Sequence, residues 1–380
     1  MSYRIPLFAL NMDRAEEEAV VRTLRSRWIS MGPECEALEA EFAAATGTRY
    51  GVAVANCTVA LHMALLAKGC GVGDEVIVPS LTFAATANAV RYTGAEPVFA
   101  DIVSDDEPLV SRQTIERVVS PRTKGIIVMH YAGFPVAFDE IEAFAKANGL
   151  FLVEDACHAP LSEYKGRKAG SLGDVGCFSF FSNKNISSGE GGMLTTDDAA
   201  IAKEFGLLRS HGMTVSSYRR SEGHATSYNI EEVGYNYRLD DIRASIARVQ
   251  LEKLPADLER RARVRDWYLS ALGDVEAVTV PFRDRRAFSS NYIMPVALRK
   301  GGARQRDLVR EAMHRRGVQT SNHYPPVHRF STYGRDDREL PRTASFSDRE
   351  ITLPMYGSLT EAQVGEVVEA LAAAITETQP

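Results

Sequence analysis

The sequence predicts an α/β protein in which a large domain built on a mostly parallel sheet is followed by a smaller α+β domain. Between residues 50 and 154, short apolar segments alternate with segments of helical periodicity, a pattern typical of βαβ units with helices on both faces of the sheet. The chain has 380 residues, too many for one ordinary domain. Beyond about residue 272 the pattern changes to isolated short strands and helices. We therefore expect a large domain at residues 1–255 and a small domain at residues 256–380.

The elements of the large domain follow from hydrophobic periodicity. Residues 16–27 and 33–45 carry apolar side chains at helical spacing. Strands and helices then alternate along the chain. The expected strands are 50–55, 75–79, 96–100, 125–130 and 151–154, and the expected helices between them are 58–67, 84–92, 112–119 and 139–148.

The small domain is introduced by one long helix, expected from residue 241 to about residue 272. Its charged stretch at residues 258–263 is read as a solvated helix face and not as a binding patch. The later elements are less regular. Strands are expected at 278–281 and 292–298, and helices at 304–316 and 361–373.

Composition excludes several classes of function. The net charge is −6 and the basic residues are scattered, so no nucleic-acid partner is expected. No apolar run reaches the roughly 18–20 residues of a membrane span, and the first residues lack a signal peptide, so we expect a cytoplasmic protein without a membrane partner. The five cysteines show no metal-ligand spacing and are read as reduced thiols, so no metal is expected: Cys35, Cys57, Cys70, Cys157 and Cys177.

The glycines at residues 69–73 do not form a dinucleotide-binding loop. They precede the strand expected at 75–79 instead of following a strand, so they cannot present a helix N-terminus to a pyrophosphate. An ordinary turn between a helix and a strand explains them. A nicotinamide-dependent dehydrogenase is therefore disfavoured.

Polar residues cluster where the expected strands end, and in parallel sheets ligands bind at those carboxyl ends. Asn56, Ser80, Thr82 and Asp155 all lie at such ends. The step from strand to helix at residues 55–58 could hold a phosphate on free backbone N–H groups, although ordinary helix capping would look the same. Asp155 could likewise cap the next helix or face a cationic ring nitrogen.

Lys184 is the most informative residue. It ends the apolar run that begins at Cys177 and is followed by the turn Gly189-Glu190-Gly191-Gly192. A lysine that forms a Schiff base needs an apolar wall and a partner that tunes the ring of the cofactor, and the segment ending in Asp155 offers that partner. Most lysines are merely solvated, so Lys184 alone does not decide between these readings.

Taken together, these segments resemble the sugar aminotransferases of the DegT/DnrJ/EryC1/StrS family, which are pyridoxal-phosphate (PLP) enzymes of the aspartate-aminotransferase fold, fold type I. The similarity extends over nearly the whole chain. The matching segments are residues 28–33, 56–62, 74–88, 154–159, 208–212, 234–239 and 323–328.

The resemblance implies a role for each residue around the cofactor. Lys184 forms the Schiff base and moves a proton, with pyridoxamine phosphate (PMP) as the intermediate form of the cofactor. Asp155 pairs with the ring nitrogen, Phe83 stacks on the ring, and His158 lies near the ring or its hydroxyl group. The residues implied to bind the phosphate are Cys57, Thr58 and Ser179, with Asn236 and Arg238 reaching it from the partner of a homodimer that shares its active sites. The residues implied to contact the substrate are Glu190, His323 and Tyr324.

The resemblance also narrows the reaction. Related sugar dehydratases carry histidine in place of the lysine, so Lys184 favours transamination. The turn around Glu190 resembles members that act at C4 of a keto-sugar, whereas members that act at C3 often carry aspartate there. We expect transfer of the amino group of L-glutamate to a nucleotide-linked keto-deoxysugar, a dTDP-4-keto-6-deoxyhexose. A C3 sugar or inosose aminotransferase, a non-transaminating PLP enzyme of the same fold and a cofactor-binding regulator remain as alternatives.

Overall fold

The computed structural model describes residues 3–215, 217–221, 223, 227–285 and 287–378. Within them, the largest sheet has seven strands in the order β1-β9-β8-β5-β4-β2-β3. All neighbours from β3 to β8 are parallel, whereas β9 is antiparallel to both β8 and β1. The strands are β1 (Tyr50–Val54), β2 (Glu75–Pro79), β3 (Glu96–Ala100), β4 (Thr123–Met129), β5 (Phe151–Asp155), β8 (Val175–Ser179) and β9 (Gly192–Thr196).

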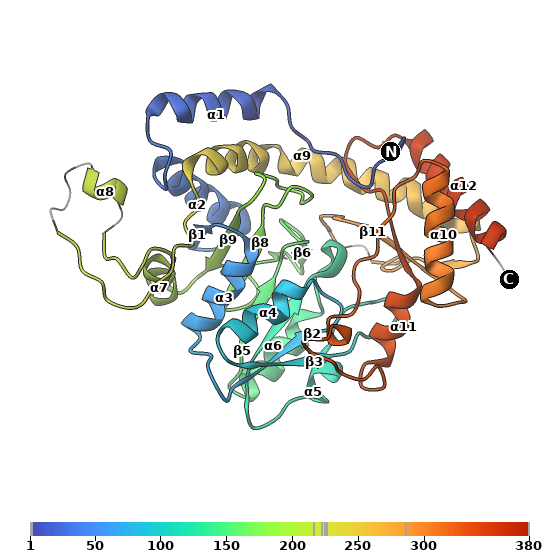
Figure 1. Cartoon of the computed structure of the whole chain (residues 1–380), viewed down its shortest axis with the longest axis horizontal. Helices are drawn as coiled ribbons and strands as arrows, with labels where there is room; N and C mark the ends of the chain where they lie inside the picture. The colour runs from blue at the N-terminus through green and yellow to red at the C-terminus, as the bar shows by residue number, and fades with distance from the viewer. Residues whose placement is uncertain (1–2, 216, 222, 224–226, 286, 379–380) are drawn as a thin grey trace.

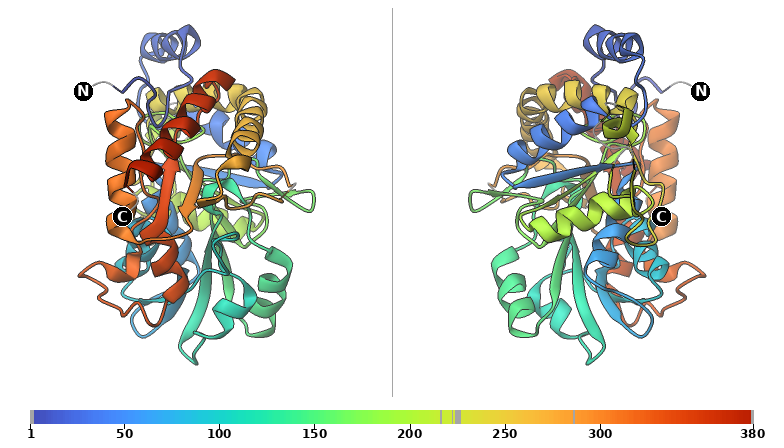
Figure 2. Two further views of the ribbon diagram at one scale, coloured as in Figure 1. Left: turned by 90° about the vertical axis from the view of Figure 1, so that its right-hand side faces the viewer. Right: turned by 90° about the vertical axis from the view of Figure 1, so that its left-hand side faces the viewer.

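Helices cover both faces of this sheet, because its strands carry apolar side chains on both sides (Figures 1 and 2). One face shares a buried apolar cluster with α3 (Cys57–Ala67), α4 (Ala84–Tyr92) and α7 (Ala199–Arg209). Two clusters fill the other face. They contain side chains of α2 (Pro33–Thr46), α5 (Arg112–Glu116), α6 (Phe138–Ala147) and the first half of α9 (Asp241–Ala271). Helix α1 (Arg14–Ser26) packs on α9.

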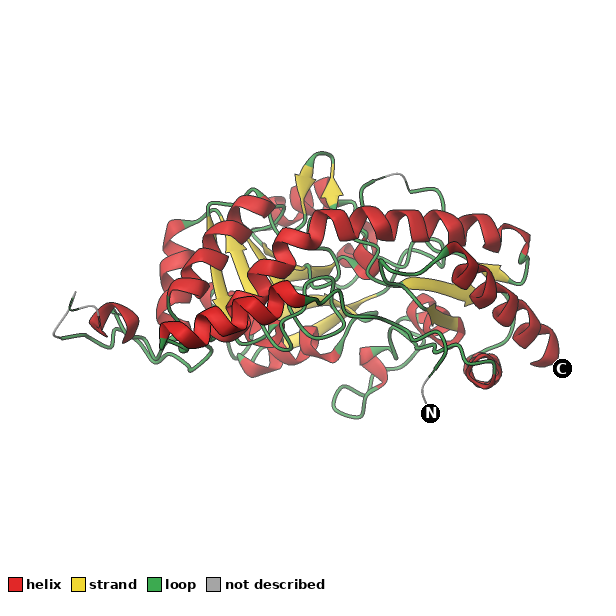
Figure 3. Ribbon diagram, turned by 90° about the horizontal axis from the view of Figure 1, so that it is seen from above, coloured by secondary structure: helices red, strands yellow, loops and turns green. Residues whose placement is uncertain are grey.

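A second, antiparallel sheet lies towards the C-terminal end of α9, as Figure 3 shows from above. Its strands are β10 (Val278–Thr279), β11 (Met294–Leu298) and β12 (Glu350–Leu353). It shares an apolar cluster with the second half of α9, with α10 (Ala303–Arg315) and with α12 (Glu361–Thr378). Ile5 belongs to the same cluster and pairs with Val318, so the N-terminal segment packs here.

The boundary expected after residue 255 falls within α9, which is continuous through Pro255. The division into domains at residues 1–255 and 256–380 stays a prediction.

Several elements differ from the sequence-based expectations. The helix expected at 112–119 ends at Glu116, and the strand expected at 278–281 is only two residues long. Strands β8 and β9 were not foreseen, because their glycines weaken the local strand signal and pairing within the sheet decides their conformation. Further elements without a sequence-based expectation are α7, α8 (Ser217–Ser221), α11 (Pro341–Arg349), β12, the hairpin of β6 (Glu163–Tyr164) and β7 (Arg167–Lys168), and the 3-10 turns η1 (Tyr131–Gly133), η2 (Leu272–Asp274) and η3 (Val327–Arg329).

No helix among the described residues is both long enough and apolar enough to span a membrane. The described part of the chain also holds no group of three or more histidine, cysteine or carboxylate side chains arranged to bind a metal ion.

Candidate active site

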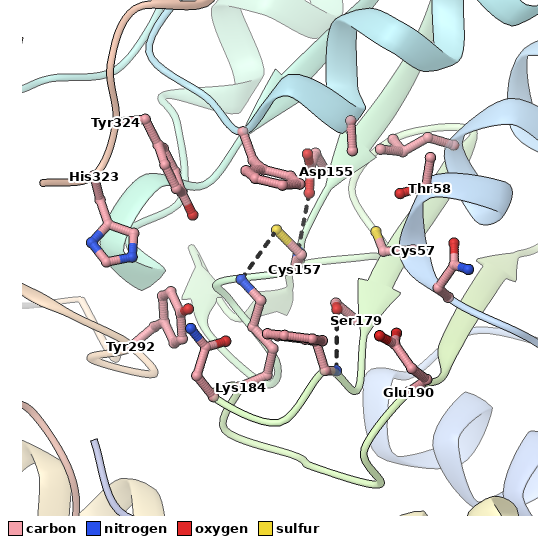
Figure 4. Close-up of a pocket in the computed structure, with 16 residues that line it drawn as sticks. Cys57, Thr58, Asp155, Cys157, Ser179, Lys184, Glu190, Tyr292, His323 and Tyr324 are labelled. Carbon is pink, nitrogen blue, oxygen red and sulfur yellow. Dashed lines mark hydrogen bonds between the residues drawn. The ribbon is translucent and has the colours of Figure 1, made fainter. Parts of the chain in front are cut away.

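A cavity of about 480 Å³ opens at the carboxyl ends of β5 and β8, the edge of the sheet where the sequence predicted a site (Figure 4). Its wall combines residues from the central sheet and its connections with residues 292–324, more than a hundred positions later in the chain. Ten of the residues singled out from the sequence line this cavity: Asn56, Cys57, Thr58, Phe83, Asp155, Ser179, Lys184, Glu190, His323 and Tyr324.

Lys184 lies in the connection between β8 and β9 and directs its side chain into the cavity (Figure 4). Its Nζ atom is 4.0 Å from Cys157 Sγ and 4.2 Å from the ring centroid of Tyr292. Burial lowers the pKa of the Lys184 ammonium, but attraction from Cys157, Tyr292 and Asp155 outweighs burial, so the pKa lies above its ordinary value. The ring of Tyr292 and the thiol of Cys157 provide the apolar wall that the proposed chemistry of the lysine requires.

Asp155 ends β5 and is buried at the inner wall of the cavity. Its Oδ2 atom accepts a hydrogen bond of 2.7 Å from Thr86 Oγ1, and its Oδ1 atom accepts one of 3.3 Å from the backbone N–H of Cys157. Thr86 is itself 2.7 Å from Thr82 Oγ1. Helix α4 therefore holds the carboxyl group in a fixed orientation.

The N-terminus of α3 forms another part of the wall. Asn56 caps this helix by accepting a hydrogen bond of 3.0 Å from the N–H of Val59, which leaves the first N–H groups of the helix, those of Cys57 and Thr58, at the cavity. Strand β9 packs directly against this turn: a Cβ atom added to Gly192 would lie 2.6 Å from the carbonyl carbon of Asn56. A helix N-terminus of this kind is suited to a phosphate group.

Phe83 and Glu190 lie at the more open side of the cavity. The Phe83 side chain, at the start of α4, is 58% exposed although its neighbours in the sheet are buried. Its ring centroid is 6.0 Å from that of Tyr324. An exposed aromatic ring in a cavity wall provides a flat surface on which a planar cofactor can stack.

His158 does not line the cavity and lies behind the aromatic residues that do. Its Nε2 atom is 2.7 Å from the hydroxyl of Tyr324, and its ring is 4.1 Å from that of Tyr292. Burial lowers the pKa of His158 well below its ordinary value and raises the pKa of Tyr324 well above its own. His158 therefore supports Tyr324 as a neutral hydrogen-bonding partner.

Asn236 and Arg238 also lie outside the cavity wall of their own chain. Asn236 is exposed, and Arg238 donates a hydrogen bond of 3.2 Å to Ser210 Oγ. The expected contact of these residues with the phosphate of a partner subunit stays a prediction.

Sequence reasoning did not single out several residues of the wall. Tyr292 is the most important of them, because its ring lies against Lys184, yet nothing in the preceding segment Ser289-Ser290-Asn291 marks it. Cys157 lies within the segment of Asp155, but its sequence context indicates only a buried thiol. The other residues of the wall that the sequence did not single out are Leu61, Ala85, Phe181 and Asn183.

The wall fits pyridoxal phosphate, the cofactor that the resemblance implies. The chain offers an amine in apolar surroundings, a buried carboxylate, an exposed aromatic ring and a helix N-terminus around one cavity. In addition, Asn183 Oδ1 is buried without a hydrogen-bond partner at this wall, so a polar group in the cavity could satisfy it. The amine, the carboxylate, the aromatic ring and the helix N-terminus match the aldehyde, ring nitrogen, ring face and phosphate of the cofactor, respectively.

The fold and the site together define a pyridoxal-phosphate enzyme of fold type I. The chain matches the DegT/DnrJ/EryC1/StrS aminotransferase family over residues 11–372. It belongs to this family.

Known relatives agree with this assignment. The chain is 37% identical over 379 residues to the spore coat polysaccharide biosynthesis protein SpsC of Bacillus subtilis, covering 98% of this chain and 96% of SpsC. The putative sugar aminotransferase Spr1654 of Streptococcus pneumoniae, solved in its PMP form, is 29% identical with a TM-score of 0.92 and covers 99% of this chain and 100% of its own. DesI, solved in the presence of its TDP-sugar product, is 31% identical with a TM-score of 0.86 and covers 99% of this chain and 92% of its own.

These comparisons confirm the fold class, the assignment as an enzyme, the aminotransferase class and the cofactor predicted from the sequence. The sugar substrate class and the need for an amino donor follow from membership of the family.

Proposed function

We propose that this enzyme transfers the amino group of L-glutamate to the 4-keto group of a dTDP-linked 4-keto-6-deoxyhexose, by a ping-pong reaction. The observation that carries the proposal is the convergence of Lys184 and Asp155 on one cavity. The similarity to DesI, which was solved with its TDP-sugar product, supports the nucleotide, and the turn containing Glu190 supports position C4. The similarity to SpsC, a polysaccharide biosynthesis protein, supports a product destined for a polysaccharide.

Bound pyridoxal phosphate supplies a carbonyl group that exchanges with amino groups and a ring that withdraws electrons from the bond being broken. In this scheme Lys184 Nζ removes the proton from Cα of the amino donor and returns a proton to the carbon that receives the amino group. The carboxylate of Asp155, held by Thr86, would pair with the ring nitrogen of the bound cofactor and keep it protonated. Tyr292 and Cys157 keep water away from the lysine.

The remaining residues bind and orient. The N–H groups at the start of α3 and the hydroxyls of Thr58 and Ser179 would hold the phosphate, and Phe83 would provide the stacking surface. Glu190, His323 and Tyr324 line the cavity and would contact the substrate.

We also propose that the enzyme acts as a homodimer in which each cavity is completed by the partner. Asn236 and Arg238 lie outside the cavity of their own chain, which supports a role across the interface. Exposed apolar side chains near the N-terminal end of the chain support a surface there that packs against the second subunit. Its members are Phe8, Leu10, Met12, Val21, Leu24 and Ile29.

The absorbance spectrum of the purified protein tests the first half of the reaction. We expect a yellow protein after reconstitution with pyridoxal phosphate, and we expect the visible band to disappear when L-glutamate is added, with release of 2-oxoglutarate. Subsequent addition of a dTDP-4-keto-6-deoxyhexose should restore the band and yield the amino sugar. An inosose that restored the band while the keto-sugar did not would replace the proposed substrate, and a yellow protein that ignored L-glutamate would exclude this donor.

A further inference from the structure

His323, at the wall of the cavity, is connected to a buried carboxyl group that has no part in the reaction described above. The backbone pairs Ser321 with Thr352 of β12 through hydrogen bonds of 3.1 and 2.9 Å, which brings the segment of His323 against this strand. Alternate residues of a strand share one face, so Glu350 and Thr352 both point towards His323. Glu350 and Thr352 are fully buried.

The two oxygens of Glu350 have different partners. Oε2 accepts a hydrogen bond of 2.8 Å from Asn322 Nδ2 and another of 2.8 Å from the backbone N–H of His323, and both of these groups can only donate. Oε1 lies 2.6 Å from Thr352 Oγ1. A proton carried by Glu350 would therefore be on Oε1, in the hydrogen bond with Thr352.

Thr352 extends the connection to the ring of His323. Its Oγ1 atom is 2.9 Å from His323 Nδ1. A hydroxyl has a single proton, so Thr352 donates to one of its two partners and accepts from the other. The connection therefore has two complete arrangements. They differ in whether Nδ1 accepts or donates, and hence in which ring nitrogen of His323 carries the proton.

We propose that Glu350 and Thr352 form a buried relay that sets the tautomer of His323, and thereby determines whether His323 Nε2 presents a donor or an acceptor to the substrate in the cavity. When Glu350 is protonated, Oε1–H donates to Thr352, Thr352 donates to Nδ1, and Nε2–H faces the cavity. When Glu350 is ionised, Nδ1–H donates to Thr352, Thr352 donates to Oε1, and the lone pair of Nε2 faces the cavity.

The two arrangements are interconverted by one proton. When Nε2 binds a proton from the cavity, Nδ1 gives its proton to Thr352 Oγ1. Thr352 in turn gives its own proton to Oε1 of Glu350. One proton thus leaves the cavity and the charge of Glu350 changes from −1 to zero. His323 remains neutral throughout.

The surroundings of Glu350 favour a change between the two arrangements of the relay at about pH 8. Burial raises the pKa of Glu350 to about 8, against opposing effects of its hydrogen bonds from Thr352 and the backbone of His323 and of the charges of Arg306 and Arg310 on α10. Burial and the charges of Lys184 and Arg310 lower the pKa of His323 to about 3, so its imidazole stays neutral. The other titratable groups around the relay are Tyr131, which donates to the carbonyl of His323, and His158, Tyr292 and Tyr324 beside its ring.

The ring nitrogens of His323 report the relay directly. We would record nitrogen NMR spectra of the enzyme with bound cofactor, labelled with ¹⁵N-histidine, between pH 6 and pH 10, and assign His323 among the eight histidines with a His323→Gln variant. We expect the protonated nitrogen to change from Nε2 to Nδ1 with a midpoint at about pH 8. A tautomer that stays the same over this range would overturn the proposal.

Two variants separate the relay from ordinary packing. Thr352→Val keeps the shape of the side chain and removes the hydroxyl, so the change of tautomer should be lost, whereas Thr352→Ser should retain it. Glu350→Gln removes the titrating group and should hold His323 in one tautomer at every pH. A Thr352→Val enzyme in which the tautomer of His323 changed with pH as in the wild type would contradict the relay. If this variant does not fold, the comparison of the wild type with Glu350→Gln tests the relay.

Only the kinetic consequence rests on the proposed function. With the keto-sugar as substrate, kcat/KM of Thr352→Val should fall roughly fivefold, the effect of one lost hydrogen bond, and that of Thr352→Ser by less than about twofold. A failure of the proposed function would appear in the absorbance spectrum with L-glutamate, and a failure of the relay in the nitrogen spectrum.

Discussion

At the residue scale, the surroundings of Lys184 determine what its amine can do. Its Nζ atom lies 4.0 Å from the thiol of Cys157 and 4.2 Å from the ring centroid of Tyr292. The carboxylate of Asp155, which tunes the ring in the proposed reaction, is instead held on the other wall by Thr86. The basic group and the carboxylate thus share one cavity but are held on different walls, so each can serve a different part of a bound cofactor.

Replacement of this lysine should abolish the reaction. Lys184→Ala removes the amine that carries the proton, so kcat should fall by roughly 10³-fold or more. Steady-state formation of the amino sugar measures this loss. Lys203→Ala is a matched control, because Lys203 lies on the exposed surface of α7 with a side chain that is 74% exposed, and its activity should equal that of the wild type. Turnover by Lys184→Ala at the wild-type rate would refute the assignment.

At the scale of elements, the contact between β9 and the start of α3 shapes the proposed phosphate site. Strand β9 runs antiparallel between β1 and β8, and its first residue, Gly192, touches the backbone of Asn56 and Cys57. A side chain has no room at this point. The absence of a Cβ atom allows the helix N-terminus to lie at the edge of the sheet where Asp155 and Ser179 end their strands.

A substitution at Gly192 should therefore displace the helix N-terminus. The added Cβ of Gly192→Ala would lie within 2.6–2.8 Å of backbone atoms of Asn56 and Cys57, so we expect a loss of about 1–3 kcal/mol in stability and weaker binding of pyridoxal phosphate. Denaturant unfolding and a titration with the cofactor measure the two effects.

Gly206→Ala is the control for this substitution. It lies within α7 with no other atom within 4 Å of the added Cβ, and should stabilise the protein by roughly 0.5–1 kcal/mol. Unchanged cofactor affinity in Gly192→Ala would show that the start of α3 is not the phosphate site.

At the scale of the whole molecule, burial of titratable groups links stability to pH. The folded state holds a proton on Glu350 up to about pH 8, whereas the ordinary pKa of this group is 4.5. The folded state also keeps His323 neutral down to about pH 3, against an ordinary pKa of 6.5. Between pH 4.5 and pH 6.5, unfolding releases a proton from Glu350 and adds one to His323, so the two groups have opposite effects on how stability changes with pH. Above pH 6.5, only Glu350 of this pair titrates on unfolding.

Stability should consequently fall as the pH rises from 6.5 to 8. In this window unfolding releases the proton of Glu350, so a higher pH favours the unfolded state by at most about 1.4 kcal/mol per pH unit. The midpoint of denaturant unfolding of the cofactor-free protein measures this change. Glu350→Gln cannot release that proton, and its midpoint should vary less over the same window. Equal slopes in the two proteins would exclude Glu350 as the source.

The proposed dimer can be tested by mixing subunits. Each of the variants Lys184→Ala and Arg238→Ala should be inactive as a homodimer. If Arg238 serves the partner's cavity, a dimer of one Lys184→Ala chain and one Arg238→Ala chain contains one intact site and one doubly altered site. Random reassociation makes half of the dimers mixed, so about a quarter of the wild-type activity should return. Recovery of no activity after mixing, with exchange of subunits verified by mass, would mean that each chain completes its own site.

The extent to which the sequence anticipated the structure differs among the strands of the seven-stranded sheet. The expected strands at 75–79 and 96–100 coincide with β2 and β3, and the expected helix at 84–92 between them coincides with α4. Their apolar runs and turns are local signals. Strands β8 and β9 could not be assigned in this way, because they contain glycines and are stabilised by pairing with distant strands.

The fold class and the segments that carry Lys184 and Asp155 could be read from the sequence, because strand-to-helix transitions and the apolar run before the lysine are local properties of the chain. The family followed from the resemblance of its segments. The contacts of Tyr292 with the lysine, of His158 with Tyr324, and of Glu350 and Thr352 with His323 became visible in the folded chain alone. These contacts join segments separated by up to 166 positions, and they depend on how the second sheet packs beside the first. No local pattern of residues encodes a distance of that kind.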